Sequence, residues 1–593
     1  MSKNIISSKV STGGGIKESC LNSKKIVLSL ATISFLASCA NAKLNSEIKT
    51  YDEANKNLKA RSVAGVYSPR SVINTTINGS HTSLIETTDS GPHTIIIEAG
   101  GTLGSIGNND KIIYAHANGS NTLTLTNLTN HGTINGKVSI EHDNNFKGTI
   151  TVNTFENKGQ VNGQIYMGVW GGNSGTLSIE KFDNSGTIAS NSQGVFFEGK
   201  NTHIKTFNNS GTIQSNTSQG VNITKGASIQ TFTNKGSISG SDGISMSGGT
   251  INTFINTGTI NSTGKTQPSA YGASSGISLS YNTIKTFNNE GLISGIFGLN
   301  LTNATIENFT NKGTIESTSN HNLGAAINLI TSYAAPSVIN NFTNEGTIKS
   351  KSNGIFAEAG NKIETLVNKG IIEASLNGIS FYDHGYGSGD RMELGKIILE
   401  EGSSIKAGNN GINIDNGSSK VIEADTIEVK KGAIVSGNNA GIYLGGGKEI
   451  NTQITIAGEV SGGAAGIVNE GVIGGSTSSG NTGGIIISGG SVSSSSGGSG
   501  IVNQGNGSIA GEIKVESGGS VEGGITNTGS GSISGNIVVE NGGKLDSITN
   551  TSTSDTGISG SITNNSDNKL EISNGEGATI GGGITNNGNA DLV

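Results

Sequence analysis

The segment with the densest set of chemically active side chains lies between residues 381 and 391. It reads Phe-Tyr-Asp-His-Gly-Tyr-Gly-Ser-Gly-Asp-Arg, with phenols, carboxylates, an imidazole and a guanidinium close together. Tyrosine and arginine are enriched among the residues that carry binding energy at interfaces. We expect a binding loop here, with a partnerless surface excursion and a catalytic loop as alternatives; its candidate residues are Tyr382, Asp383, His384, Tyr386, Asp390 and Arg391.

Cys39 is the second residue that could be chemically modified. Residues 1–42 resemble a long secretory leader, because Lys24 and Lys25 precede an apolar stretch too short to span a membrane. Leu36-Ala-Ser-Cys39 resembles a bacterial lipobox, in which Cys39 would be acylated, and the several chains of such an anchor would hold it stably on a membrane. Cleavage after Ala42, at a small-x-small site, is the alternative.

The rest of the sequence favours neither catalysis nor a metal site. Asp89-Ser-Gly-Pro92 superficially has the form of a serine-protease nucleophile turn, but it is equally a plain turn, and we expect the latter. Zinc-protease, P-loop and EF-hand spacings are absent, so we expect no catalytic residue, no metal and no cofactor. The isolated histidines are expected on solvated faces: His81, His93, His131, His203 and His321.

Net charge argues against a nucleic-acid partner. The formal charge is -7, and no basic stripe follows any part of the chain. A phosphate backbone needs such a cationic surface.

The element that must position these side chains is a repeated heptapeptide, an aromatic residue or Leu followed by x-Asn-x-Gly-x-Ile. Copies recur at intervals of 22 to 33 residues, which marks a stack of supersecondary units. They start at Phe155, Phe182, Phe207, Phe232, Phe254, Phe287, Phe309 and Phe342, with degenerate copies at Leu128 and Leu366.

This repeat predicts an all-β fold, a right-handed parallel β-helix of about 20 coils and on the order of 95 Å long at the strand spacing of a sheet. The chain holds 94 Gly and only 4 Pro, and its apolar residues form short β-branched runs bounded by turn residues. We expect the phenylalanines to stack inside the coils. The repeat asparagine should occupy a turn, where it tolerates left-handed geometry and can bond the backbone of the next coil, and the glycine should supply a positive φ.

Composition divides the chain into four parts. After the leader at 1–42, residues 43–70 form a polar linker, residues 71–395 carry the heptapeptide, and residues 396–593 continue the β-helix in a glycine-richer form. Two long intervals contain insertions near Pro268 and Pro336, which we expect on one side of the rod. Insertions on one face of a repeat protein often form its binding face.

The leader, the cysteine-free body and the Phe-Thr-Asn-x-Gly-Thr-Ile units resemble the passenger domains of bacterial type V autotransporters, and among them the Campylobacter autotransporter adhesins. The resemblance spans nearly the whole chain. It implies an exported adhesin at the outer membrane or cell surface, or a secreted one, that binds a host cell-surface glycan or protein through loops on a rod. A polysaccharide-active β-helical enzyme is the alternative.

One departure from that family concerns the end of the chain. Passengers of this kind precede a translocating β-barrel, and residues up to Val593 have no such pattern. We therefore expect a passenger fragment, a truncated product without function or half of a split gene. Such a chain would remain periplasmic, or reach the outer membrane through an anchor at Cys39.

Overall fold

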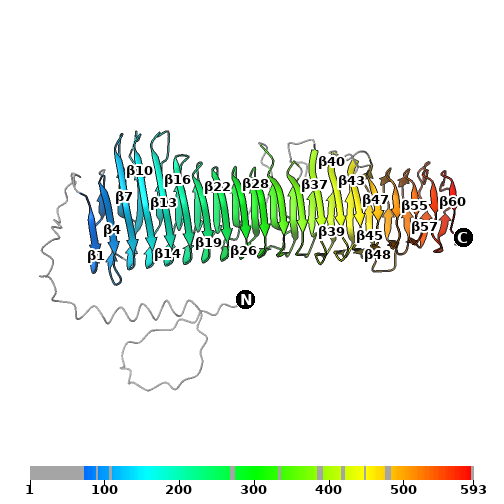
Figure 1. The fold of residues 1–593 in the computed structure, drawn as a ribbon, viewed down its shortest axis with the longest axis horizontal. Coiled ribbons are helices and arrows are strands. Elements are labelled where there is room, and N and C mark those ends of the chain that lie inside the picture. Colours follow the sequence, from blue (N-terminus) through cyan, green and yellow to red (C-terminus); the bar gives the residue numbers. More distant parts are fainter. Residues whose placement is uncertain are drawn as a thin grey trace, which may run out of the picture. The chain divides into compact units, whose positions relative to one another are not determined.

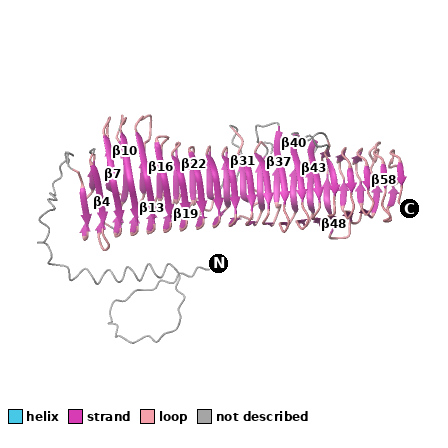
Figure 2. Ribbon diagram, in the orientation of Figure 1, coloured by secondary structure: helices cyan, strands magenta, loops and turns pink. Residues whose placement is uncertain are grey.

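The computed structural model describes residues 72–588, which belong to one compact unit, Pro69–Val593. Within that range residues 89–90, 106–109, 144, 267–273, 331–334, 359, 383–390, 416–420, 447–448 and 475–482 are not described. Several of the expected features therefore lie outside the described residues. They are Cys39, the linker at residues 43–70, and Asp383, His384, Tyr386 and Asp390 of the expected loop. The described part contains strands and turns and no helix (Figure 2).

Three parallel sheets run along the molecule, and each coil contributes a strand to each of them. The first coil consists of β1 (Asn74–Ile77) in sheet A, β2 (Ser80–His81) in sheet B and β3 (Ile85–Thr87) in sheet C. β1 pairs in parallel with β4 (Pro92–Ile97) of the second coil, and this pattern repeats to β60 (Ile584–Asn586) (Figure 1). The fold is a parallel β-helix, as expected.

The number of coils also agrees with the expectation of about 20. Among the described residues, sheets A, B and C hold 23, 18 and 19 strands. Sheet A has more strands because its column divides after β43 (Glu449–Ile456), whose two halves pair with β46 (Val472–Ile473) and β47 (Gly484–Ile487). The column runs unbroken past residue 396 through β37 (Arg391–Leu399), so the change of composition there is not a change of fold.

The interior is built from side chains that face inward at the same place in successive coils. In β10 (Thr149–Asn157), β13 (Thr176–Asn184) and β16 (Thr202–Asn209), Phe155, Phe182 and Phe207 are in register and fully buried. Their ring centroids lie 4.6 and 4.8 Å apart with nearly parallel planes. The stack continues to Phe342, with one edge-to-face step at Phe287 and Phe309. The predicted inner stack is confirmed.

The repeat asparagine meets its expectation in part, since Asn157 Nδ2 donates to the backbone oxygen of Thr187 in the next coil at 3.2 Å. It is the last residue of its sheet A strand, it is buried, and it does not have a positive φ. Each side-chain amide donates from Nδ2 to Oδ1 of its counterpart in the next coil: 2.7 Å from Asn130 to Asn157 and 2.7 Å from Asn157 to Asn184. The ladder proceeds in the same way to Asn368. A buried amide must find partners, and here identical residues supply them.

The repeat glycine also differs from the expectation, since its φ is not positive. Its reason is close packing between coils. A Cβ atom on Gly186 would lie 2.0 Å from the carbonyl oxygen of Gly159, and one on Gly211 would lie 2.0 Å from that of Gly186. Each of these carbonyl oxygens accepts a hydrogen bond from the following coil. The N–H of Thr187, for example, donates to Gly159 O at 2.9 Å. Any side chain would displace that contact.

In the glycine-rich half the asparagine ladder reappears at a different corner. It now follows the ends of sheet C strands, which include β45 (Ala465–Asn469) and β49 (Ile501–Asn503). Asn469 donates to Asn503 at 2.7 Å, and Asn503 donates to Asn527 at 2.7 Å. The sequence Gly-Ile-Val-Asn, which occurs at residues 466–469 and 500–503, therefore forms a second asparagine ladder.

The two insertions leave the coils at two corners and not on one side. The first follows β23 (Thr259–Ser262) of sheet B and precedes β24 (Ser275–Ser280) of sheet C. The second follows β30 (Ala325–Ile330) of sheet C and precedes β31 (Val338–Asn344) of sheet A. Both insertions thus border sheet C, one at each of its edges.

Candidate functional site

The outer face of sheet C, called face C below, carries the residues with the widest range of chemistry. Its central row begins with Glu86, Tyr114, Ser139, Tyr166 and Phe196, paired in register through β6 (Lys111–Ala117), β9 (Lys137–His142), β12 (Ile165–Gly168) and β15 (Val195–Glu198). Outward side chains alternate with inward ones along a strand, so this row is set by the register of the coils.

The corresponding row of sheet B is chemically plainer. It runs through Thr187, Thr212, Ser237 and Thr259, also in register. Hydroxyl and β-branched side chains of this kind suit the outside of a strand. Aromatic side chains gather instead on face C, whereas charged residues also line sheet B, where Glu316, Lys349, Glu373 and Lys406 are paired in register.

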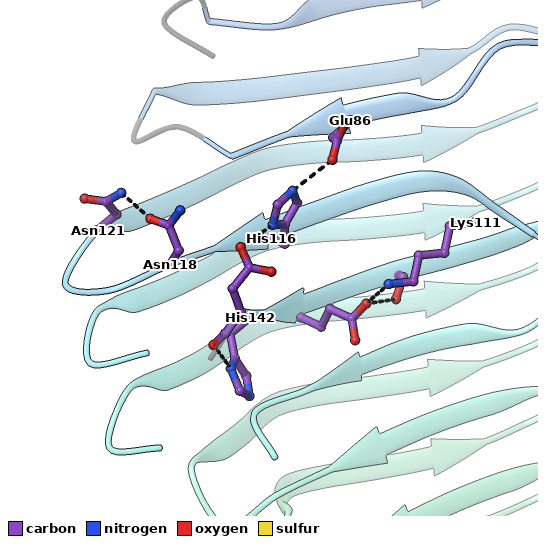
Figure 3. Close-up of polar contacts among 9 residues, drawn as sticks. Glu86, Lys111, His116, Asn118, Asn121 and His142 are labelled. Carbon is purple, nitrogen blue, oxygen red and sulfur yellow. Dashed lines mark hydrogen bonds and ion pairs between the residues drawn. The ribbon is translucent and has the colours of Figure 1, made fainter. Parts of the chain in front are cut away.

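His116 is the centre of an amino-terminal cluster on face C. Its Nε2 lies 3.0 Å from Glu86 Oε1 and its Nδ1 lies 2.9 Å from Asp143 Oδ2 (Figure 3). The two contacts can be hydrogen bonds at the same time only when both ring nitrogens carry a proton. The ring stacks on Tyr114 at 4.1 Å between centroids. Three consecutive coils therefore meet at one imidazole.

Two lysines complete this cluster. Lys111 forms an ion pair with Glu141, and its Nζ lies 3.8 Å from the centroid of the Tyr114 ring. Lys137 Nζ lies 4.6 Å from the centroid of the Tyr166 ring, and burial lowers the pKa of this lysine. Ammonium groups at such distances are attracted to the ring faces.

Tyr166 connects the cluster to the next coil. Its hydroxyl donates to Glu198 Oε2 at 2.8 Å, and burial, followed by that bond, raises the pKa of the phenol. Lys225 pairs with the other oxygen of Glu198 at 2.5 Å. The acids and bases of the amino-terminal cluster thus largely neutralise one another.

Trp170 lies at the edge of face C, with 37% of its surface exposed. Its backbone N–H donates to His142 Nε2 at 2.9 Å, and the two rings lie 5.1 Å apart. His142 Nδ1 bonds Asp143 O at 2.6 Å, so the hydrogen of the ring lies on Nδ1. The tryptophan is therefore presented at the edge of face C by a fixed histidine.

The expectation that the isolated histidines face solvent is wrong for His93. Its side chain is fully buried, with Nε2 2.8 Å from Thr87 Oγ1, and its Nδ1 accepts from Ile73 N at 3.1 Å. The other isolated histidines, at 81, 131, 203 and 321, are partly or fully exposed.

Of the expected loop, Tyr382 and the backbone of Arg391 are described. Tyr382 ends β36 (Ile379–Tyr382) of sheet C and packs beside Phe297, Ala325 and Phe356, which form a small apolar cluster on face C. Arg391 begins β37 of sheet A. The loop between them leaves the same corner as the insertion near Pro336.

A second part of face C is hollowed into a pocket of about 410 Å³ between β39 (Asn410–Asp415) and β49. Tyr443 from β42 (Ala440–Gly445) donates to Glu470 Oε2 at 2.8 Å, and Gln504 Nε2 donates to Oε1 at 2.7 Å. Burial, and then the charge of Glu470, raises the pKa of Asp415. This pocket was not predicted from the sequence. A signal was present in the strands of sheet C, where a polar or aromatic residue that faces outward, such as Asn413 or Tyr443, stands between two apolar residues that face inward.

The described residues contain no group of three or more His, Cys, Asp or Glu side chains placed to hold a metal ion. Nor do they contain a helix long and apolar enough to cross a membrane.

The fold and face C define a class, a parallel β-helix with a polar and aromatic outer face. Comparison with known proteins adds no closer relationship. No family model, curated protein or solved structure matches the chain.

Proposed function

We propose that this chain is an exported adhesin of the autotransporter-passenger kind, which binds a host cell-surface glycan or protein through face C. The observation that carries the proposal is the gathering of aromatic side chains on face C, beside charged and polar ones, with insertions at both of its edges. Loops and rigid aromatic residues carry recognition in many binding proteins. The proposed contact surface is therefore a sheet face with bordering loops, which include residues 383–390.

Attachment to the cell would come from the amino terminus. The resemblance of residues 36–39 to a lipobox supports acylation of Cys39. Several acyl chains would anchor the rod at the outer membrane, with face C available along its length.

A polysaccharide-active enzyme is the second candidate, favoured by the carboxylates Glu86, Asp143 and Glu141 around His116 and Lys111. Glycoside hydrolysis needs one carboxyl group as acid and another as base or nucleophile. In this cluster Glu86 and Asp143 contact His116, and Glu141 pairs with Lys111. Such pairing suits binding better than proton transfer, and we therefore place adhesion first.

The experiment is a cell-binding assay with the purified full chain, labelled and added to epithelial cells. Saturable binding is expected, and deletion of residues 383–390 or the Trp170→Ala change should weaken it. Lys205→Ala, on the outside of sheet A, removes an exposed side chain elsewhere and serves as the control. Absence of saturable binding at micromolar concentration contradicts the proposal, and release of reducing sugar from a polysaccharide would favour the enzyme.

A further inference from the structure

We propose that the pocket between β39 and β49 binds a sugar residue that carries no negative charge, either neutral or amino-bearing. This inference rests on the proposed function and names the ligand class for one part of face C. The pocket is formed by four successive coils. Asn413, Tyr443, Val468 and Val502 occupy the same outward position in those coils and are paired in register.

The size and shape of the pocket suit a small polar ligand. Its volume is about 410 Å³, within the range of about 300–1,000 Å³ usual for ligand pockets. Val502 supplies an apolar surface beside the buried Val468, and Asp415, Glu470 and Gln504 lie at the ends of their strands or one residue beyond. A sugar ring has both apolar C–H faces and a rim of hydroxyl groups, so it matches this division.

The polar groups are held in place before any ligand arrives. Glu470 accepts from Tyr443 and from Gln504, one bond to each carboxylate oxygen. Asn410 Nδ2 donates to Asn413 Oδ1 at 2.8 Å, and Asn439 Nδ2 donates to Asn410 Oδ1 at 2.9 Å. Each carboxylate oxygen can accept more than one hydrogen bond, so Glu470 remains able to accept from a hydroxyl or amino group.

Asp415 adds a second acceptor beside the first. Gly445 lies between it and Tyr443, because a Cβ atom there would be 2.9 Å from Asp415 Oδ1 and 2.6 Å from Tyr443 Cε1. Glycine therefore leaves the space in which the carboxylate and the ring approach one another. The result is a rim of fixed acceptors around an apolar patch.

Charge decides which sugars fit. The described residues that line the pocket include two carboxylates, Asp415 and Glu470, and no lysine, arginine or histidine. In the amino-terminal cluster, by contrast, Glu141 pairs with Lys111 and Glu198 with Lys225. A sialic or uronic acid would bring a further negative charge beside the two in the pocket, and like charges at close range are unfavourable.

The experiment measures binding of three probes to the full chain by isothermal titration calorimetry. The probes are the N-acetylglucosamine trimer, which is neutral, the glucosamine trimer, which is cationic, and sialyllactose, which is anionic. We expect one or both of the first two to bind and sialyllactose not to bind. Asp415→Asn and Glu470→Gln should each raise Kd by about tenfold, the equivalent of one good polar contact.

Glu459→Gln is the matched control, because it removes the same charge from an exposed residue on β44 (Glu459–Gly462) of sheet B. It should leave Kd unchanged. Binding of the neutral trimer alone would show that the pocket recognises hydroxyl donors. Binding of the cationic trimer alone would show that it recognises amino groups. Preference for sialyllactose, no binding of any probe, or Kd values that the Asp415 and Glu470 changes leave unaltered would overturn the inference.

The cell-binding assay separates this inference from the proposed function. Cells bound equally well by wild type and by Asp415→Asn would leave adhesion standing and remove the pocket from it. Binding of a sugar probe without binding of cells would leave the pocket standing as a sugar site and contradict adhesion. Circular dichroism of each variant checks that the coils remain folded.

Discussion

A Cβ atom added to Gly186 would lie 2.0 Å from the carbonyl oxygen of Gly159, its counterpart one coil earlier. The same relationship recurs between Gly211 and Gly186 and between Gly236 and Gly211. The backbone of each coil therefore touches the next at this corner with no room for a side chain. The repeat glycine is required by the stacking of coils, and not by the geometry of a turn.

The first prediction concerns this contact. Gly186→Ala should destabilise the protein by about 2–4 kcal/mol, because the methyl group forces neighbouring coils apart. Gly172→Ala, where nothing lies within 4 Å, should change stability by at most about 0.5 kcal/mol. Urea unfolding followed by circular dichroism and by the fluorescence of Trp170 measures both. Equal stability of the two variants would show that the corner accommodates a side chain.

The second prediction concerns the asparagine ladder. Asn234→Ala removes the acceptor used by Asn209 and the donor used by Asn256, at 2.7 and 2.8 Å. Two buried amide groups are then left short of partners, which should cost about 2–4 kcal/mol. Asn216→Ala is the control, because Asn216 is exposed and its bond to Asn191 competes with water. Thermal unfolding should separate the two variants clearly.

The third prediction concerns the phenylalanine stack. Phe254 is buried between Phe232 and Phe287. Phe254→Ala should cost about 3–5 kcal/mol through the cavity that it leaves. Phe254→Leu should cost only about 1 kcal/mol, since Leu128 and Leu366 already occupy this position in the register of the stack. If Leu proves as costly as Ala, ring stacking rather than volume sets the stability.

The fourth prediction concerns pH. Burial, and then the charge of Glu470, raises the pKa of Asp415 above its ordinary value of 3.8. Between those two values the folded protein binds more protons at this residue than the unfolded chain, so its contribution to stability falls as pH rises. Asp415→Asn should remove this part of the pH dependence and stabilise the protein at neutral pH.

Urea midpoints of wild type and Asp415→Asn between pH 3 and pH 7 check that sign. The difference between the two proteins should grow in favour of the variant as pH rises. A constant difference, or a growing advantage of wild type, would contradict the shift.

The inward half of each coil could be predicted from the sequence. Phe, Asn, Gly and Ile recur at a spacing that only a stack of coils explains, and Phe155 and Phe182 do meet ring to ring. The bond from Asn157 to the backbone of the next coil could be predicted. Its ladder and the role of Gly159 could not, because a sequence shows that asparagine and glycine recur but not whether a turn or a close contact demands them. Side-chain contact across coils and the absence of Cβ were the actual requirements.

The sequence by itself thus determined the coil, its period and the residues that point inward, because those residues obey one repeated steric rule. Only the tertiary structure decided which outward residues meet. Glu86, His116 and Asp143 come together from three coils, and so do Tyr443, Glu470 and Gln504. These partners lie 27 to 34 residues apart, and coil lengths vary along the chain. Their alignment therefore follows from the register of the sheets, which no local pattern of residues specifies.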